Sequence, residues 1–222
     1  MKKTPHIAPP PDAKTERVPL WLKGAYSVFM AILVPVYWYH YGWTNFLYFC
    51  DVALFVTWIG LCKESRFWIS LAAVGILLPQ MLWCVDWVFE VSGGKLTGMT
   101  SYMFDAGKPF YLRALSSFHG WLPWLLIFVL AKLGYDRRAL GAWIVVAVVL
   151  CGVAYLFLPP AGAPLADPNL PRNVNYVFGM DDANPQTRWA PLTYLGLWVG
   201  GLVTLVYWPT HLMLKRLFAR SA

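Results

Sequence analysis

The sequence predicts an all-α integral membrane protein with six transmembrane helices. Hydrophobic residues make up 59% of the 222 residues and charged residues only 13%, about half the charged share of an average soluble domain. Several apolar stretches reach about 20 residues, the length that a helix needs to cross the hydrocarbon core. The 13 Trp and 12 Tyr residues fit a chain that meets lipid headgroups, where amphipathic rings collect. These charges are too few to cover the surface of a soluble protein.

Six apolar stretches, separated by polar residues, qualify as spans. We expect transmembrane helices at residues 20–40, 45–62, 67–91, 115–134, 139–158 and 190–214. Three connections, at 42–45, 63–66 and 134–138, are so short that they allow only antiparallel neighbours. Two connections are longer, at 92–113 and 159–189. We expect residues 19–218 to form a single six-helix domain.

The stretch MKKTPHIAPPPDAKTERVP precedes the first span and is rich in proline and charged residues. The first apolar run is longer than the h-region of a signal peptide, and no small-residue cleavage site follows it. We therefore interpret residues 1–18 as a disordered cytoplasmic tail before an uncleaved first helix.

Basic residues define the expected orientation. With the N-terminus inside, 13 of the 18 Lys and Arg residues fall on the inner face, and cytoplasmic loops are enriched in these residues. We expect both termini in the cytoplasm, the two longer loops outside, and a multi-pass protein of the plasma (inner) membrane. The net charge of +7 follows from this topology. The basic residues lie on short turns and tails without forming a stripe, so we expect no nucleic-acid partner.

Polar side chains within or beside the spans share one level, in the outer half of the predicted membrane: His40, Tyr48, Cys50, Asp51, Asp86, Glu90 and His119. Charged groups at membrane depth are costly and usually face the bundle interior or a wet cavity, which makes them functional candidates. We therefore predict a polar pocket that opens outward between the second, third and fourth helices. The last long loop, with Asn173 and Asn175, can fold over this pocket as a lid.

Several of these residues also have a structural interpretation. Cys50 can be a small core residue, since free Cys behaves as a hydrophobe. Asp51 and Asp86 can form ion pairs with Arg113 or Lys108 from the outer loop. The sequence alone leaves these interpretations open.

Glu90 and His40 lie nearest to the outer surface. Glu90 equally fits a solvated helix end, and His40, in the run YWYHYGW, equally fits an interfacial aromatic belt. His119 is different, because an imidazole within a transmembrane helix needs partners. Pro123 adds to its environment, since proline interrupts the bond to residue i−4 and thereby frees the His119 carbonyl.

A Cys and a His in one partly dry pocket favour nucleophilic catalysis. In this interpretation His119 takes the thiol proton and Cys50 attacks an ester carbonyl, while Asp51 and Asn175 orient the reacting groups. No cofactor is needed. The substrate would be a membrane lipid that reaches the site from the outer leaflet, and the protein would be a lipid-acyl transferase or a lipid ester hydrolase.

Two other classes of function stay open. Asp86 and Glu90 are spaced i, i+4 and share a helical face; with Asp51 and His119 they could hold a divalent metal and a metal-activated water, as in a metal-dependent hydrolase. An HxxxH signature is missing, and no CxxC pair supports a zinc framework or a disulfide. Alternatively, the protein is no enzyme, and the pocket belongs to a transport path or an assembly subunit.

Three stretches carry a resemblance to a known family: FCDVALF at 49–55, FHGWLPWLL at 118–126 and NVNYVFG at 173–179. Through them the chain resembles the YwaF-type six-helix integral membrane family, which is related to a Cys/His membrane phospholipid acyltransferase and to androgen-induced-gene-type lipid hydrolases. The resemblance implies Cys50 as acyl acceptor, His119 as base, and Asp51 and Asn175 in support. That family often has His two residues before the Cys, where this chain has Tyr48.

Overall fold

The computed structural model describes residues 18–218 as helices and their connections. Its main helices are α1 (Leu20–Tyr41), α2 (Phe49–Cys62), α3 (Arg66–Val91), α4 (Phe110–Ser116), α5 (Phe118–Leu133), α6 (Ala139–Phe157), α7 (Pro191–Gly201) and α8 (Trp208–Phe218). Short 3₁₀ and π-helical segments are η1 (Trp43–Leu47), η2 (Ser101–Met103), η3 (Val174–Tyr176) and η4 (Leu202–Tyr207). Of the predicted tail, all but Val18 lies outside the described residues.

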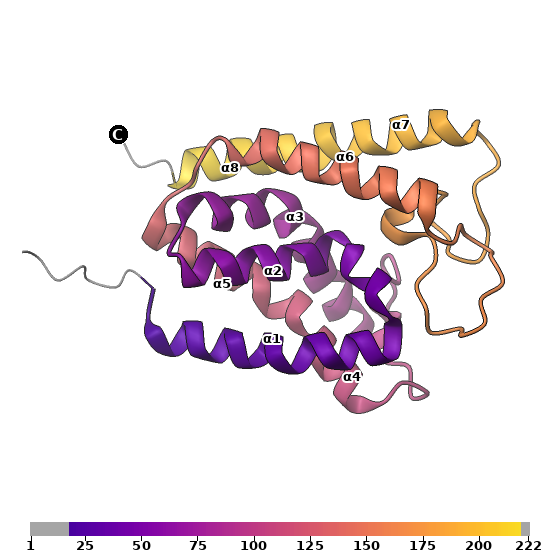
Figure 1. Cartoon of the computed structure of the whole chain (residues 1–222), viewed down its shortest axis with the longest axis horizontal. Helices are drawn as coiled ribbons and strands as arrows, with labels where there is room; N and C mark the ends of the chain where they lie inside the picture. Colours follow the sequence, from indigo (N-terminus) through magenta and orange to yellow (C-terminus); the bar gives the residue numbers. More distant parts are fainter. Residues whose placement is uncertain (1–17, 219–222) are drawn as a thin grey trace, which may run out of the picture.

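The helices run lengthwise between two ends of the molecule (Figure 1). One end carries the connections 92–109 and 158–190, and we call it the long-loop end. The other carries the turns 63–65 and 134–138, and we call it the short-turn end. The first and last described helices meet this second end. There Lys23 Nζ lies 2.7 Å from Glu64 Oε1, and the Tyr135 N–H donates to the Phe218 carbonyl over 3.0 Å.

Within the described residues, five helical segments are long and apolar enough to cross a membrane: 20–41, 66–91, 110–133, 139–157 and 191–218. The helix α2 is apolar but has only 14 residues, and it runs between the same two ends. The prediction of an all-α protein with multiple membrane passes is therefore confirmed at this level. Which end faces the cytoplasm stays a prediction.

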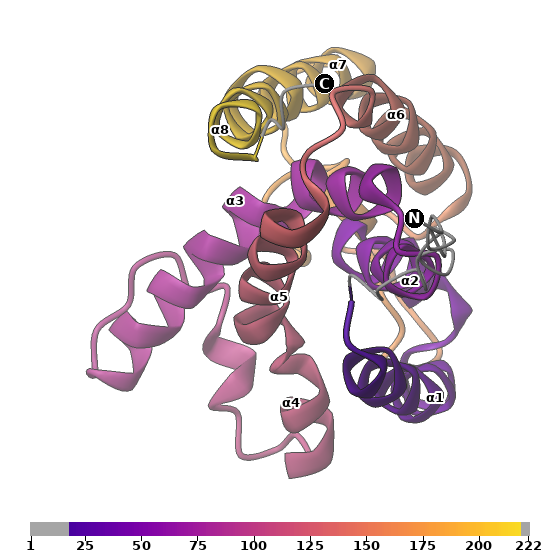
Figure 2. The ribbon, with the colours of Figure 1, turned by 90° about the vertical axis from the view of Figure 1, so that its left-hand side faces the viewer.

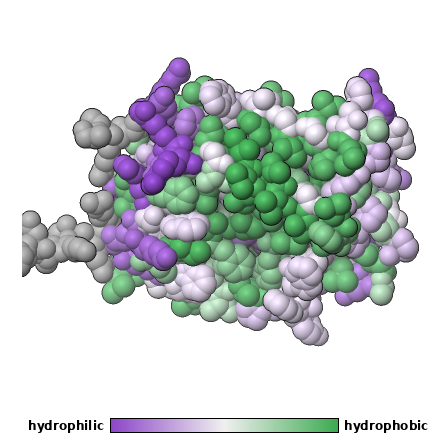
Figure 3. Space-filling model, turned by 45° about the horizontal axis from the view of Figure 1, so that its top comes forward, coloured by the Kyte–Doolittle hydropathy of each residue, from purple (hydrophilic) through white to green (hydrophobic). Residues whose placement is uncertain are grey.

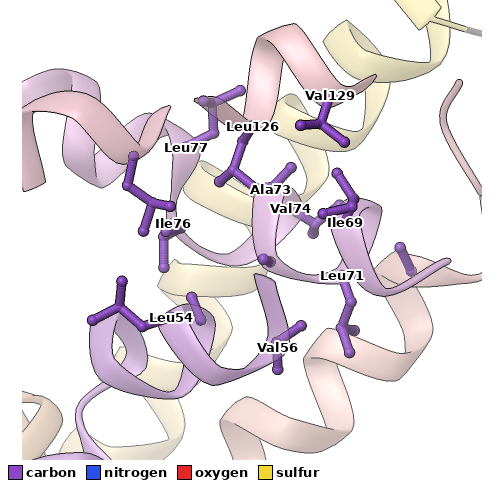
Figure 4. Close-up of a cluster of buried hydrophobic side chains, with 14 of the residues drawn as sticks. Leu54, Val56, Ile69, Leu71, Ala73, Val74, Ile76, Leu77, Leu126 and Val129 are labelled. Atoms are coloured by element: carbon purple, nitrogen blue, oxygen red, sulfur yellow. The ribbon is translucent and has the colours of Figure 1, made fainter. Parts of the chain in front are cut away.

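The centre of the bundle is α3, which packs against α2, α5, α6 and α8. Figure 2 shows α6, α7 and α8 grouped along one side of it. Buried apolar side chains fill the contact of α2, α3 and α5 (Figure 4), among them Leu54, Ile69, Leu77, Leu126 and Val129. This apolar core occupies the bundle between the level of Asp51 and the short-turn end.

Glycine and proline mark several helix boundaries. Gly42 follows α1 with a φ of 72°, and Gly134 follows α5 with a φ of 84°; a residue with a side chain tolerates this left-handed region poorly, which is why Gly ends helices. At the other boundary, α7 begins with Pro191, where the missing N–H of proline is not needed.

The structure corrects two predicted boundaries. The predicted helix 45–62 is divided at Tyr48, whose extended backbone (φ −64°, ψ 142°) separates η1 from α2. At about 1.5 Å per residue, α2 is about 21 Å long, shorter than the hydrocarbon core of about 30 Å. The predicted helix 115–134 starts earlier, at Phe110, and is interrupted at Ser117 between α4 and α5.

The change Gly75→Ala tests the close approach of α3 and α6. A Cβ on Gly75 would lie 1.9 Å from Cε2 of Trp143, a fully buried side chain. Because the ring has no room to withdraw, we expect a loss of stability of about 1–3 kcal/mol, the usual cost of overpacking. The readout is a lower midpoint of thermal unfolding in detergent.

The control for this change is Gly141→Ala on α6, because nothing lies within 4 Å of the Cβ position there. Gly141→Ala should leave the midpoint unchanged or raise it slightly, since Ala favours helix. Equal destabilisation by both changes would contradict the assigned contact.

Candidate functional site

Polar side chains of α2 and α3 lie at one level near the long-loop end. A Cβ on Gly60 would lie 2.7 Å from Cδ1 of Ile69, so these two residues face each other where α2 meets α3. The two helices are antiparallel and have the same rise per residue. Cys50 on α2 and Gln80 on α3 both lie about ten residues from that contact, toward the long-loop end, so they are at the same level. We call Cys50, Asp51, Gln80, Trp83, Tyr102 and His119 the polar layer.

Among residues 18–218, three members of this layer have buried polar atoms without a hydrogen-bond partner: Asp51, Gln80 and Trp83, whose indole lies beside the Tyr102 phenol. Asp51 is 3% exposed; its Oδ2 receives the Asn45 amide over 3.4 Å and the Cys50 thiol over 3.6 Å, while its Oδ1 has no hydrogen-bond partner. Gln80 is 2% exposed, and neither its amide nitrogen nor its oxygen has a partner. A buried polar atom left unpaired costs about 1–3 kcal/mol. Asp51 and Gln80 thus leave an acceptor and an amide unsatisfied at the same level.

The proposed ion pairs of Asp51 and Asp86 do not form. Within residues 18–218 the salt bridges join Lys23 to Glu64 and Arg138 to Asp136, and Arg113 donates instead to the Met103 carbonyl over 3.1 Å. Lys108 lies over the ring of Tyr102, 5.5 Å from its centroid. Asp51 therefore has no cationic side chain as its counterpart among the described residues.

Tyrosines from three other segments surround Cys50 and Asp51. The hydroxyls of Tyr37 on α1 and Tyr48 before α2 both lie within electrostatic range of Asp51. Tyr102 belongs to η2 in the loop after α3; burial raises the pKa of its phenol, the adjacent Trp83 indole opposes this, and Cys50 and Asp51 raise it further. The polar layer is therefore covered by aromatic side chains from α1, from the junction of η1 and α2, and from the loop after α3.

His119 is held close to α3. Its Nδ1 lies 2.9 Å from the Ser116 carbonyl, and because a carbonyl only accepts, the proton sits on Nδ1 and Nε2 is left as an acceptor. Its ring stacks on Trp83 with centroids 5.5 Å apart. Its own carbonyl, which Pro123 cannot bond, lies 3.8 Å from the Cys84 thiol. Ser116 in turn bonds to Tyr37 over 2.7 Å.

The structure brings Cys50 together with Asp51, and His119 together with Trp83. Within the described part of the chain no hydrogen bond joins Cys50 to His119, whose ring nitrogen Nδ1 is occupied by Ser116. A catalytic Cys–His pair stays a prediction that needs the free Nε2 of His119 to reach the thiol.

Asp86 and Glu90 anchor the loop after α3. Asp86 is fully buried and accepts the N–H groups of Thr97 (2.6 Å), Gly98 (3.1 Å) and Thr100 (3.0 Å) and lies 2.8 Å from the Thr100 hydroxyl. That hydroxyl also lies 2.7 Å from Glu90 Oε2. Both carboxyl oxygens of Asp86 are thus used by the loop.

These contacts bear on the predicted metal site. Among residues 18–218 no group of three or more His, Cys, Asp and Glu side chains is arranged to hold a metal ion. The oxygens of Asp86 face backbone N–H groups, and His119 turns to Ser116. Of the four predicted ligands, Asp86 and Glu90 share the Thr100 hydroxyl, whereas Asp51 and His119 have other partners.

Asn175 ties the last long loop to the start of α2. It is buried with a φ of 59°, its amide donates to the Leu47 carbonyl over 2.9 Å, and its Oδ1 accepts the Phe49 N–H over 3.0 Å. The side chain satisfies an N–H that the helix leaves free at its first turn. Trp198 on α7 donates to the Asn175 carbonyl over 2.8 Å. This clamp explains why the predicted helix 45–62 is interrupted at Tyr48.

Asn173 and His40 have structural contacts of their own. Asn173 is buried; its amide donates to the Gly179 carbonyl over 2.8 Å, and its oxygen accepts the Phe178 N–H over 2.9 Å. His40 pairs through Nε2 with the Tyr111 hydroxyl of α4 over 2.7 Å, on the exposed side of α1. Neither side chain belongs to the polar layer.

Residue patterns did not point to Gln80, Trp83, Tyr37 or Tyr102 as site residues. Gln80 carried a usable signal, because it is an uncharged but strongly polar residue inside the apolar run ILLPQMLWC. The three aromatic residues carried none, because they resemble the many other rings of the chain.

The change Asp86→Asn tests the loop anchor. Whichever way the amide is turned, its NH₂ faces loop groups that need an acceptor, so we expect local stability to fall by about 2–3 kcal/mol. Hydrogen exchange of the 92–109 amides should become faster. Asp105→Asn, at an exposed aspartate that accepts the Gly107 N–H, should change exchange little; unchanged exchange in Asp86→Asn would disprove the anchor.

The change Asn175→Ala tests the clamp on α2. Loss of a side chain that caps a helix start typically costs about 0.5–2 kcal/mol, and the thiol of Cys50, at the second position of α2, should react faster with a maleimide probe. Asn184→Ala removes an exposed side chain that bonds to Asp181 over 2.9 Å and serves as the control. If both variants react at the wild-type rate, the clamp does not hold α2.

No known protein family, characterised protein or solved structure matches this chain. The residues of the polar layer themselves therefore support the functional proposal below.

Proposed function

We propose that this protein binds a membrane lipid with its polar headgroup in the polar layer and transfers or hydrolyses the acyl group at Cys50. One observation carries the proposal: among residues 18–218, Asp51 Oδ1 and the Gln80 amide are buried without hydrogen-bond partners at one level of the bundle, and Asp51 lies beside the Cys50 thiol. A buried polar group without a partner in the protein needs an explanation, such as a bound ligand or a water molecule. Ionisable residues at membrane depth mark functional sites by default.

The layer suits a headgroup that donates hydrogen bonds. A hydroxyl or amine of the lipid donates to Asp51 Oδ1, which receives no hydrogen bond from residues 18–218. The Gln80 amide offers an N–H group to an ester carbonyl, where a donor stabilises the oxyanion that develops during acyl transfer. Aromatic side chains around Asp51 provide apolar walls, as is usual for small-molecule sites.

Cys50 and Asp51 supply the reacting groups in this proposal. The thiol lies 3.6 Å from Asp51 Oδ2. As sulfur attacks the ester carbonyl, its proton passes to the carboxylate and then to the leaving alcohol, so that a thioester on Cys50 replaces the ester bond. Water or a second alcohol releases the acyl group. In a second route His119 is the base: its free Nε2 turns toward the thiol and accepts the proton in place of Asp51.

The packing favours access from one side. Apolar side chains fill the contact of α2, α3 and α5 between the polar layer and the short-turn end (Figure 4). A transport path would need polar groups through this region. We therefore propose a site open at the long-loop end, and from the basic residues of the short turns we assign that end to the outside. The resemblance to the YwaF-type family agrees with this proposal.

Acyl transfer to Cys50 can be tested by intact mass measurement. Purified protein in nanodiscs whose phospholipid carries deuterated acyl chains should gain one acyl mass, removable by neutral hydroxylamine. Cys50→Ala should abolish the adduct, and Asp51→Asn should reduce its rate about a hundredfold, the low end of what a positioned base contributes. Cys62→Ala, at an exposed thiol near the short-turn end, is the matched control.

A wild-type protein that remains unmodified with every lipid ester offered would overturn acyl transfer. An adduct that persists in Cys50→Ala would place the reaction at another residue. Thermal unfolding midpoints of the variants show whether a lost adduct reflects lost fold.

A further inference from the structure

A second group of polar side chains lies at the short-turn end, away from the polar layer. Arg137 on the α5–α6 turn and Lys215 on α8 both lie within electrostatic range of the His211 ring. The ring is fixed, because its Nδ1 lies 2.7 Å from the Tyr135 hydroxyl. Tyr135 is held to α8 a second time by its N–H, which donates to the Phe218 carbonyl over 3.0 Å. Arg137 and Lys215 therefore lie near one imidazole, which Tyr135 holds in place.

The acidic side chains nearby are already paired. Asp136 binds Arg138 through both oxygens, over 3.1 Å to Nε and 2.8 Å to Nη2, and this hydrogen-bonded guanidinium lowers the pKa of Asp136. Glu64 contacts Lys23 over 2.7 Å. Among residues 18–218 no salt bridge reaches Arg137 or Lys215. Like charges held together without a counterion repel each other, so this cluster suits an anion.

The chemistry of the cluster suits phosphate. Arg presents a planar fork of donors that matches phosphate oxygens, and Lys adds a point charge. When the Tyr135 hydroxyl donates to Nδ1 of His211, the ring proton sits on Nε2 and can donate as well. Arg137 is exposed and Lys215 half-buried, so both remain accessible.

The surroundings of the cluster are those of a membrane surface. Trp208, Leu212 and Leu217 on the same helix are exposed apolar side chains. Figure 3 shows hydrophilic side chains gathered at this end directly beside a broad hydrophobic band. A ligand that contacts both the basic cluster and the neighbouring hydrophobic band would need an anionic headgroup and acyl chains. We propose that Arg137, His211 and Lys215 bind the phosphate headgroup of an anionic phospholipid in the leaflet at the short-turn end.

This site is independent of acyl transfer, because it uses other residues at the opposite end of the bundle. Binding of fluorescent phosphatidylglycerol to the full-length protein in a neutral detergent tests it, with phosphatidylcholine as the zwitterionic reference. We expect phosphatidylglycerol to bind at least about tenfold more tightly. Removing both charges in Arg137→Gln/Lys215→Gln should weaken the binding of phosphatidylglycerol about 30-fold, as two lost charges near an anionic surface predict.

The control Lys95→Gln/Arg188→Gln removes two charges from exposed positions at the long-loop end and should leave the affinity unchanged. The charge-conserving variant Arg137→Lys/Lys215→Arg should keep most of the binding and shows that the fold tolerates change here. Three results would overturn the proposal: equal affinity for the two lipids, equal loss in both double variants, or displacement of the lipid by an equal concentration of inorganic phosphate.

Discussion

The hydrocarbon core offers no water to a polar group, and this constraint governs how the polar residues of the protein are arranged. Each N–H, carbonyl or carboxylate at membrane depth must find a partner within the protein. Asp86 does so with three N–H groups and a hydroxyl of one loop, and Asn175 with a carbonyl and an N–H at the start of α2. Asp51 and Gln80 depart from this pattern, and among the described residues single atoms of Thr57, Trp83, Arg113, Trp143 and Tyr207 also lack partners. Asp51 is the one carboxylate in this group.

The satisfied groups build the frame in which the exception lies. The carboxylate of Asp86 holds the loop that carries Tyr102 to the level of Asp51, and the Asn175 clamp fixes the first turn of α2, on which Cys50 and Asp51 lie. The contacts of Asp86 and Asn175 thus position the polar layer. The layer itself keeps an acceptor and an amide without protein partners, as a site for a polar headgroup requires.

The architecture could largely be predicted because hydrophobic length and Gly or Pro boundaries are local properties of the chain. The spans, the short turns and the grouping of Cys50 with Asp51 follow from such patterns. The freed His119 carbonyl also follows, because proline acts on a residue four positions away.

The details that were missed depend on distant partners. The interruption at Tyr48 is caused by Asn175, more than a hundred residues later in the chain. The role of Asp86 depends on the N–H groups of a loop whose fold could not be predicted from sequence patterns. The orientation of His119 depends on Ser116 and Trp83. Side-chain type indicates which residues can react, but only packing decides which of them meet.

An experimental structure in lipid nanodiscs tests the central claim most directly. The account predicts non-protein density within hydrogen-bond distance of both Asp51 Oδ1 and the Gln80 amide, continuous with an acyl chain that leaves the bundle near the long-loop end. The account is contradicted if Asp51 and Gln80 bond to each other or to other side chains and no density lies between them.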